Sequence, residues 1–368
     1  MTEPRRTALP SPAEAPLLIV VGAGGVGKTT LAASIALHSA AAGAETLVMT
    51  FDPSLRLKDT LGVGEEARDR EIEVASGIPG GLWASLLDAR RTFDRLVARH
   101  APDAASRDRI LGNRYYQSLA GSLAGILEYM AVERLWEAWS AGTWQRIVLD
   151  TPPTRQALDF LEAPERIVGF LDSGALRLAL KPWFDEGGRL KATSKWGRLG
   201  KGLEGWLDEV VGLDLLRDMG EFFRAFGPLF TGFRQRALDV QALLRQPGTC
   251  FLLVAGPGEE RNPDTLFFAR RLQDAGYRLG PIVVNRVHPL PPDAPPPAAA
   301  GDEADGRRVL AWLGERDLEG VAALRKLLPA TQPLADLPLL PSEPVDLPSL
   351  ATLATLLQER LGRQAAPS

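Results

Sequence analysis

The stretch Gly22-Ala23-Gly24-Gly25-Val26-Gly27-Lys28-Thr29 decides the fold, and Thr30 follows it directly. It fits the pattern G-x-x-x-x-G-K-[ST] and lies between an apolar run, residues 17–21, and a helical pattern, residues 29–41. In such a loop the backbone N–H groups point at phosphate oxygens, and the positive end of the helix adds to the attraction. Lys28 is then expected to reach the β- and γ-phosphates, Thr29 to bind Mg²⁺ and Thr30 to contact the α-phosphate. A chance glycine-rich turn is the disfavoured alternative, because so many positions agree.

Short apolar runs recur along the chain and alternate with helical patterns. The runs are residues 17–21, 46–51, 82–87, 146–149, 250–254 and 281–284, and the helical patterns are residues 29–41, 116–139 and 265–275. Short, fully apolar strands that alternate with helices are typical of a parallel sheet buried on both faces. The fold class predicted is therefore α/β: a P-loop NTPase with a doubly wound, mostly parallel sheet flanked by helices.

The spacing of the runs predicts additions to this α/β domain. Residues 1–16 are interpreted as a flexible leader and residues 17–368 as the ATPase domain. Long gaps between strands, at about residues 89–140 and 165–245, predict an inserted α-helical subdomain, because structureless loops of that length are rare. Residues 287–306 are rich in proline and are interpreted as a loop.

Composition excludes several function classes. The net charge of −4 gives no evidence for general nucleic-acid binding. Cys250 is the only cysteine, which excludes an intramolecular disulfide and a thiolate zinc site within one chain. The N-terminus has no apolar core of signal-peptide length before the first strand, and no apolar run is long enough for a spanning helix. The chain is therefore expected to be cytoplasmic and not an integral membrane protein.

Two aspartates follow apolar strands and are candidates for the metal shell and for positioning the attacking water. Asp150 ends the strand at residues 146–149, and Asp52 follows the strand at residues 46–51. The turn Thr151-Pro152-Pro153-Thr154 comes next and is rigid enough to sense a γ-phosphate. The alternative for each aspartate alone is an ordinary turn or capping residue. Since strand ends of a parallel sheet converge on the ligand crevice, two of them beside a P-loop favour a functional role.

At this point the sequence resembles the arsenite-pump ATPase family, which includes the ATPases that target tail-anchored proteins. The P-loop resembles that family's K-G-G-V-G-K-T-T. Residues 52–59, DPSLRLKD, look like its first switch, D-P-A-H-N-L-S-D, and residues 150–161, DTPPTRQALDFL, look like its second, D-T-A-P-T-G-H-T-L-R-F-L. Residues 283–286, VVNR, are similar to its V-N-Q segment.

The resemblance implies an ATPase that uses ATP and Mg²⁺ and works as a homodimer. It implies that Asp52 activates water, that Asp150 is an indirect magnesium partner and that Asn285 contacts adenine. It also implies a hydrophobic protein client, with peripheral membrane contact left open.

The sequence departs from the family at Ala23, where the family carries a signature lysine that reaches the partner's active site. Without that charge, hydrolysis is expected to be slow unless another cation replaces it, and Arg56 and Arg155 in the switch segments are the candidates. The single Cys250 also disfavours arsenite transport and a zinc-bridged dimer, which need several thiolates.

Three weaker patterns concern partners. Aromatic residues at helical spacing between 219 and 233 could line a client groove, although core packing is the favoured interpretation. The basic tract at residues 187–202 is interpreted as a solvated loop, and the leucine-rich residues 347–361 as a helix packed on the sheet rather than on a membrane. Two alternatives to the client-binding switch remain: a membrane- or nucleoid-associated positioning or partition ATPase, and a nucleotide-binding regulatory module with little turnover.

Overall fold

The computed structural model describes residues 12, 14–51, 56–101, 103–112, 126–172, 232–292 and 306–365. The chain divides into two compact units. The first contains residues 1–87, 138–158 and 243–368, and the second contains residues 88–137 and 159–242.

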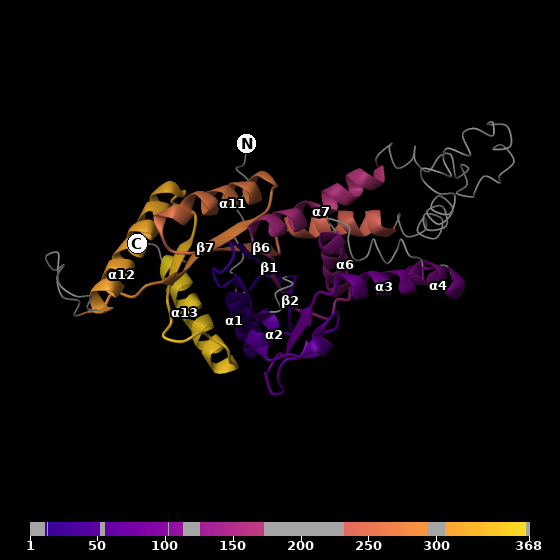
Figure 1. Cartoon of the computed structure of the whole chain (residues 1–368), viewed down its shortest axis with the longest axis horizontal. Helices are drawn as coiled ribbons and strands as arrows, with labels where there is room; N and C mark the ends of the chain where they lie inside the picture. Colours follow the sequence, from indigo (N-terminus) through magenta and orange to yellow (C-terminus); the bar gives the residue numbers. More distant parts are fainter. Residues whose placement is uncertain are drawn as a thin grey trace, which may run out of the picture. The chain divides into compact units, whose positions relative to one another are not determined.

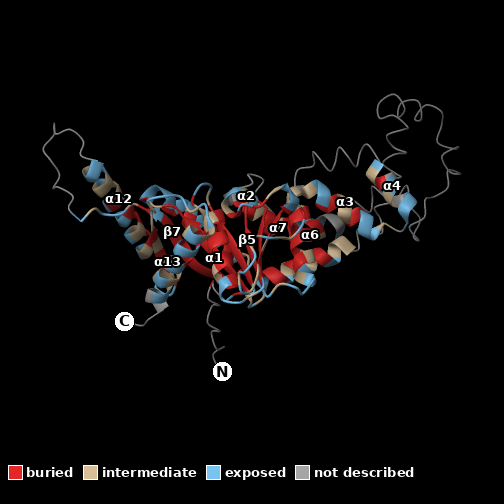
Figure 2. Ribbon diagram, turned by 90° about the horizontal axis from the view of Figure 1, so that it is seen from below, coloured by how far each residue is buried: buried red, intermediate tan, exposed pale blue. Residues whose placement is uncertain are grey.

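The first unit is built on one eight-stranded sheet with the order β3-β4-β2-β5-β1-β6-β7-β8. Its strands are β1 (Leu17–Gly22), β2 (Thr46–Thr50), β3 (Ile72–Glu73), β4 (Leu82–Leu86), β5 (Arg146–Asp150), β6 (Thr249–Ala255), β7 (Leu279–Val287) and β8 (Leu334–Pro338). All neighbours pair in parallel except β3 and β4, which are antiparallel. Every residue of β1, β2, β5 and β6 is buried, which explains why these strands read as continuous apolar runs (Figure 2).

Helices cover both faces of this sheet, as the alternation of patterns predicted. Those of this unit are α1 (Lys28–Ala41), α2 (Arg56–Leu61), α11 (Asn262–Asp274), α12 (Gly306–Leu327) and α13 (Leu347–Ala365), with 3₁₀ turns at Glu65–Ala67 and Glu259–Arg261. Figure 1 shows α11 on the opposite side of the sheet from α1 and α13. The α/β fold with a mostly parallel sheet is therefore confirmed.

The C-terminal helix α13 packs inside this unit. Leu350, Leu353 and Leu357 are buried in the same hydrophobic cluster as Leu31 and Ile35 of α1. The interpretation of residues 347–361 as a packed helix is thus confirmed.

The sequence patterns missed some elements of the first unit. The apolar residues 337–340 indicate a last strand, and the structure places that strand slightly earlier, at Leu334–Pro338. The 22-residue helix α12 was not predicted at all, because its buried positions are mostly polar or small: Gly314, Asp317, Gly320 and Leu324. The proline-rich segment overlaps the end of β7, and residues 293–305 lie outside the described ranges.

The second unit is helical in its described parts. It contains α3 (Ala89–His100), α4 (Ala104–Gly112), most of α6 (Ile126–Ser140), most of α7 (Thr154–Asp172) and helical residues 232–242. Arg236 Nε lies 2.5 Å from Glu133 Oε1, and both side chains are almost fully buried. Desolvation raises the pKa of Glu133, and the bond from Arg236 opposes that shift. Residues 187–202 and most of the aromatic pattern at 219–233 lie outside the described residues, and the boundaries of the insertion stay a prediction.

Candidate nucleotide-binding site

The glycine-rich loop leaves the carboxyl end of β1, in the interior of the sheet between β5 and β6. Gly22 ends the strand with φ +149°, and a Cβ there would lie 2.0 Å from the carbonyl oxygen of Val254. Gly27 has φ +92°, and its Cβ would lie 2.4 Å from Nδ2 of Asn285. Only glycine fits both positions, since each combines a disfavoured backbone with a steric collision.

The first turn of α1 presents the two residues expected to handle phosphate and metal. Lys28 Nζ donates a hydrogen bond of 2.8 Å to the carbonyl oxygen of Ala23, across the loop. Thr29 follows it at the start of the helix, where unpaired N–H groups and the helix dipole favour an anion. The lysine is thus held over the loop by the loop's own backbone.

Asp150 brings the second strand end to the loop, as the sequence predicted. Its carboxylate is fully buried and accepts hydrogen bonds from Thr29 Oγ1 at 2.8 Å and from Thr50 Oγ1 at 3.0 Å. A threonine hydroxyl that donates its proton to a carboxylate turns an oxygen lone pair outward, which is the donor that Mg²⁺ accepts. The residues present therefore fit a magnesium ion held by Thr29 directly and by Asp150 indirectly. Within the described residues, no cluster of three His, Cys, Asp or Glu side chains offers a site made of protein ligands alone.

The segment after β5 lies against the loop. Thr151 Oγ1 donates 2.8 Å to the carbonyl oxygen of Val20, which fixes the start of the turn beside β1. Gly24 lies beside Pro153, whose Cβ would be 3.7 Å from a Cβ on that glycine. Pro152 is buried, and α7 begins at Thr154. The start of this segment is therefore fixed beside the loop.

Asn285 and Arg286, near the end of β7, contact the loop from its other side. Asn285 Nδ2 donates 2.8 Å to the carbonyl oxygen of Val26. Arg286 Nη1 donates 2.9 Å to the carbonyl oxygen of Gly25. Asn285 was predicted at this site, whereas Arg286 was not assigned a role, because nothing in its spacing indicates that it faces the loop.

A cavity of about 720 Å³ opens beside these residues. It is lined by Gly24, Gly25, Gly27, Lys28, Thr29, Thr30, Asp59, Thr60, Pro153, Asn285, Arg286, Pro338, Leu339, Leu340, Ser342, Glu343, Pro344, Val345 and Leu353. One part of the lining is polar and comes from the loop, and a second wall comes largely from residues 338–345 and is mostly apolar. This second wall was also missed, since proline and leucine after a strand carry no recognisable motif.

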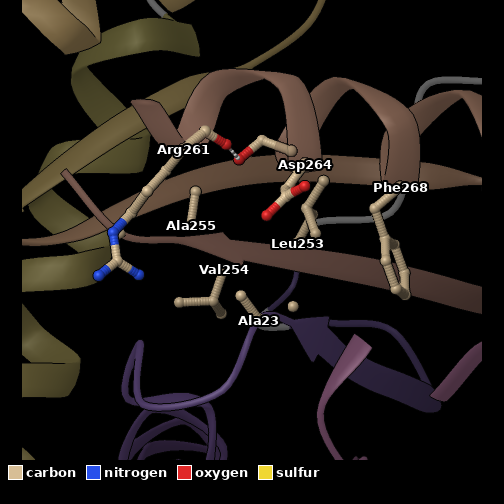
Figure 3. Close-up of a pocket in the computed structure, with 10 residues that line it drawn as sticks. Ala23, Leu253, Val254, Ala255, Arg261, Asp264 and Phe268 are labelled. Atoms are coloured by element: carbon tan, nitrogen blue, oxygen red, sulfur yellow. Dashed lines mark hydrogen bonds between the residues drawn. The ribbon is translucent and has the colours of Figure 1, made fainter. Parts of the chain in front are cut away.

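Ala23 faces a separate, much smaller cavity of about 30 Å³ on the β6 side of the loop. Figure 3 shows the Arg261 guanidinium and the Asp264 carboxylate reaching from the start of α11 toward the strand and loop that carry Val254 and Ala23. An acidic and a basic side chain therefore lie close to Ala23, the position at which the family that this sequence resembles carries lysine.

Several predicted residues fall outside what the structure describes. Asp52 lies in the undescribed residues 52–55. Arg56 begins α2, and Thr154 and Arg155 begin α7, but the side chains of these three residues are not described. Their catalytic and switch roles stay predictions.

Cys250 is placed where it cannot serve as an accessible thiolate. It is fully buried in β6, and burial raises its pKa to about 12 despite the nearby charge of Arg146. The thiol is thus protonated at neutral pH, which supports the view that this chain does not capture a metalloid through cysteine.

A strand–loop–helix phosphate cradle at the carboxyl edge of a parallel sheet, with a buried aspartate on the threonine hydroxyl, defines a P-loop nucleotide-binding protein. Residues 16–182 match the family model of the anion-transporting ATPases. This part of the chain, which carries the loop and Asp150, is therefore similar to that family, as the resemblance indicated.

Three relatives extend the comparison. An uncharacterised protein of Streptomyces coelicolor is 29% identical over 83% of this chain and 71% of its own length. A protein of Mycobacterium tuberculosis is 33% identical over 42% of this chain and 38% of its own length. The ATPase get3 of Aspergillus terreus is 33% identical over 40% of this chain and 42% of its own length. The chain therefore spans less than half of the latter two.

Proposed function

We propose that this chain is a magnesium-dependent ATPase that acts as a homodimeric switch and couples its nucleotide state to the binding of a hydrophobic protein client. The observation that carries the ATPase part is the bond from Thr29 to Asp150, which joins the loop to the end of a second strand. The similarity to an ATPase of Aspergillus terreus supports it. Dimerisation and client binding rest on the resemblance to the family alone.

In this proposal, different residues at the loop bind different parts of ATP. The loop N–H groups and Lys28 bind the phosphates, since the ammonium group of Lys28 has three N–H donors and its bond to Ala23 occupies one of them. Thr30 contacts the α-phosphate. Asn285 keeps its Nδ2 on Val26 while its Oδ1 accepts from the exocyclic amino group of adenine. Leu339, Leu340 and Pro344 supply the apolar surface that a base needs.

Thr29 would hold magnesium through Oγ1, and Asp150 keeps that hydroxyl oriented. The bound ion would neutralise charge that develops on the β- and γ-phosphates. Asp52, which follows β2 by two residues in the sequence, is proposed to activate the attacking water, because the ends of β1, β2 and β5 meet at one edge of the sheet.

Ala23 supplies no charge for the transferred phosphoryl group, so turnover is slow unless another cation replaces that charge. Arg56 and Arg155 are the proposed replacements. A second candidate function is a regulatory module that binds ATP with little turnover, and Ala23 is the observation that favours it.

The helices within the described ranges include none that is long and apolar enough to cross a bilayer. A cytoplasmic location stays a prediction, and so does a role as a positioning or partition ATPase. That role predicts that liposomes or DNA stimulate hydrolysis, whereas a client-binding switch requires neither.

Steady-state phosphate release from ATP tests the enzyme part. We expect wild-type turnover that depends on Mg²⁺ and is lost in Asp52→Asn, with ATP binding retained in that variant. Binding without phosphate release in the wild type would support the regulatory module instead, and absence of ATP binding would refute both. Sedimentation of Asp52→Asn with and without ATP tests the homodimer, and affinity capture with the same ATP-bound variant tests for the client.

A further inference from the structure

Asn285 and Arg286 are consecutive residues of β7, and both contact the phosphate loop. In a regular strand, consecutive side chains point to opposite faces, so only one of them could reach the loop. Arg286 has φ +65°, a left-handed backbone that is uncommon for arginine. The pairing of β7 with β8 also shifts in register between Val284 and Val287. The strand is therefore distorted at the position that turns Arg286 toward the loop, as bulges next to ligand sites do.

The two side chains hold adjacent carbonyl groups of the loop. Asn285 binds the carbonyl of Val26 and Arg286 binds the carbonyl of Gly25, at 2.8 and 2.9 Å. When the N–H groups of such a loop face the phosphates, its carbonyl groups face outward. Donors on the outside therefore fix the orientation of the N–H groups on the inside. The bond from Arg286 acts on Gly25, which has φ +76° and whose Cβ position has no atom within 4 Å to restrain it sterically.

Arg286 also reaches the other wall of the nucleotide cavity. Its Nη2 lies 3.4 Å from Oε1 of Glu343, which belongs to the segment at residues 338–345 that lines the same cavity. Because the guanidinium is planar and has five N–H donors, one arginine can serve two acceptors in different directions. The Glu343 contact is long and exposed, so solvent screens it, and the contact to Gly25 is the stronger of the two.

We propose that Arg286 is a positioning residue of the nucleotide site, which fixes the phosphate loop from outside in its binding conformation and ties it to the segment carrying Glu343. The proposal rests on the proposed function, since it needs the cavity to bind ATP. The distorted backbone of β7 is then a feature of the site, because a regular strand would place Arg286 away from Gly25.

The two contacts can be separated by the choice of ligand. The affinity for inorganic tripolyphosphate depends on the loop alone. The affinity for ATP depends on the loop and on the wall made by residues 338–345. We expect Arg286→Gln to lower the affinity for both ligands by about tenfold, as loss of one charge-assisted hydrogen bond does. Arg286→Lys should recover most of this loss, because an ammonium group can still donate to Gly25. Glu343→Gln should lower the affinity for ATP by less than about threefold and leave the affinity for tripolyphosphate unchanged.

Isothermal titration of the full chain with both ligands in the presence of Mg²⁺ measures these affinities, and Arg270→Gln is the matched control. Arg270 is exposed on α11, so its substitution removes the same charge away from the cavity. A steady-state assay adds a second readout: Arg286→Gln should raise the KM for ATP and leave kcat within about twofold, because the side chain does not touch the reacting phosphate.

Three outcomes would overturn the proposal: wild-type affinities in Arg286→Gln, an equal loss in Arg270→Gln, or no recovery in Arg286→Lys when thermal unfolding shows both variants folded. If Arg286→Gln does not fold, Arg286→Lys and Glu343→Gln still test the two contacts. Wild-type protein that binds neither ligand would refute the proposed function itself, whereas wild-type binding with unchanged variants would refute only the role of Arg286.

Discussion

Thr29 Oγ1 donates a hydrogen bond of 2.8 Å to Oδ2 of Asp150, although 121 residues separate the two in sequence. The contact exists because β1 and β5 are neighbours in the sheet and Val20 pairs with Asp150. Both groups are buried, so water does not compete for the bond. It links the start of the helix after the phosphate loop to the start of the second switch segment.

Asp150→Asn should lower magnesium-dependent phosphate release by about 10- to 100-fold, which is the usual effect of losing a group that orients a metal ligand. The amide cannot accept from two hydroxyl groups as strongly as the carboxylate accepts from Thr29 and Thr50. Titration of ATPase activity with Mg²⁺ measures the effect. Thr50→Val is the control, since it removes one donor without touching the loop, and it should cost much less. Equal activity in Asp150→Asn and wild type would contradict the assigned role.

Gly27→Ala should impair ATP binding more than Gly25→Ala does. Both glycines have positive φ, but an added Cβ at Gly27 lies 2.4 Å from Asn285 Nδ2, whereas at Gly25 it meets no atom within 4 Å. Gly25→Ala therefore introduces backbone strain alone, about 1 kcal/mol. Gly27→Ala adds to that strain a collision that displaces Asn285. Nucleotide titration and thermal unfolding of both variants check this. The steric argument is wrong if the two lose affinity to the same extent.

Ala23→Lys should raise turnover by at least about tenfold, because it supplies the cation that stabilises charge on the transferred phosphoryl group. The side chain would enter the region of Asp264 and Arg261, which line the cavity next to Ala23. Phosphate release at saturating ATP is the measurement. Ala23→Met is the control, with similar length and no charge. Unchanged turnover in Ala23→Lys would mean that another residue already supplies the charge.

Cys250 should react with a thiol reagent only when the protein unfolds. The thiol is buried, and its pKa of about 12 lies well above the value of 9.0 expected when unfolded. Labelling between pH 7 and 9 should therefore stay slow in native protein and become rapid in denaturant. Between pH 9 and about 12, the thiol ionises only in the unfolded chain. The contribution of this group to the free energy of unfolding therefore falls as pH rises. Rapid labelling of native protein at pH 8 would show that β6 is exposed.

The parts of the site that follow a strand or a motif could be predicted from the sequence. The loop at Gly22–Thr29 and the buried aspartate at Asp150 are signalled by spacing, because backbone geometry and metal binding require those residue types there. The amide of Asn285 was found only through the resemblance. Arg286 could not be predicted, since its direction depends on a distorted φ and on a register shift that arise from pairing with β8. Nor could α12, whose buried face depends on Asp317, which accepts bonds from the ring and backbone of His288.

The position of β1 in the sheet has a consequence for synthesis. β1 pairs with β5 on one side and with β6 on the other, and β6 begins only at Thr249. A nascent chain that has emerged only as far as β5 therefore carries β1 as an open, fully apolar edge, which is the kind of edge that pairs with other chains. We expect translation pauses or truncations before residue 249 to yield aggregates, and chaperones that shield this edge to govern how much of the protein matures.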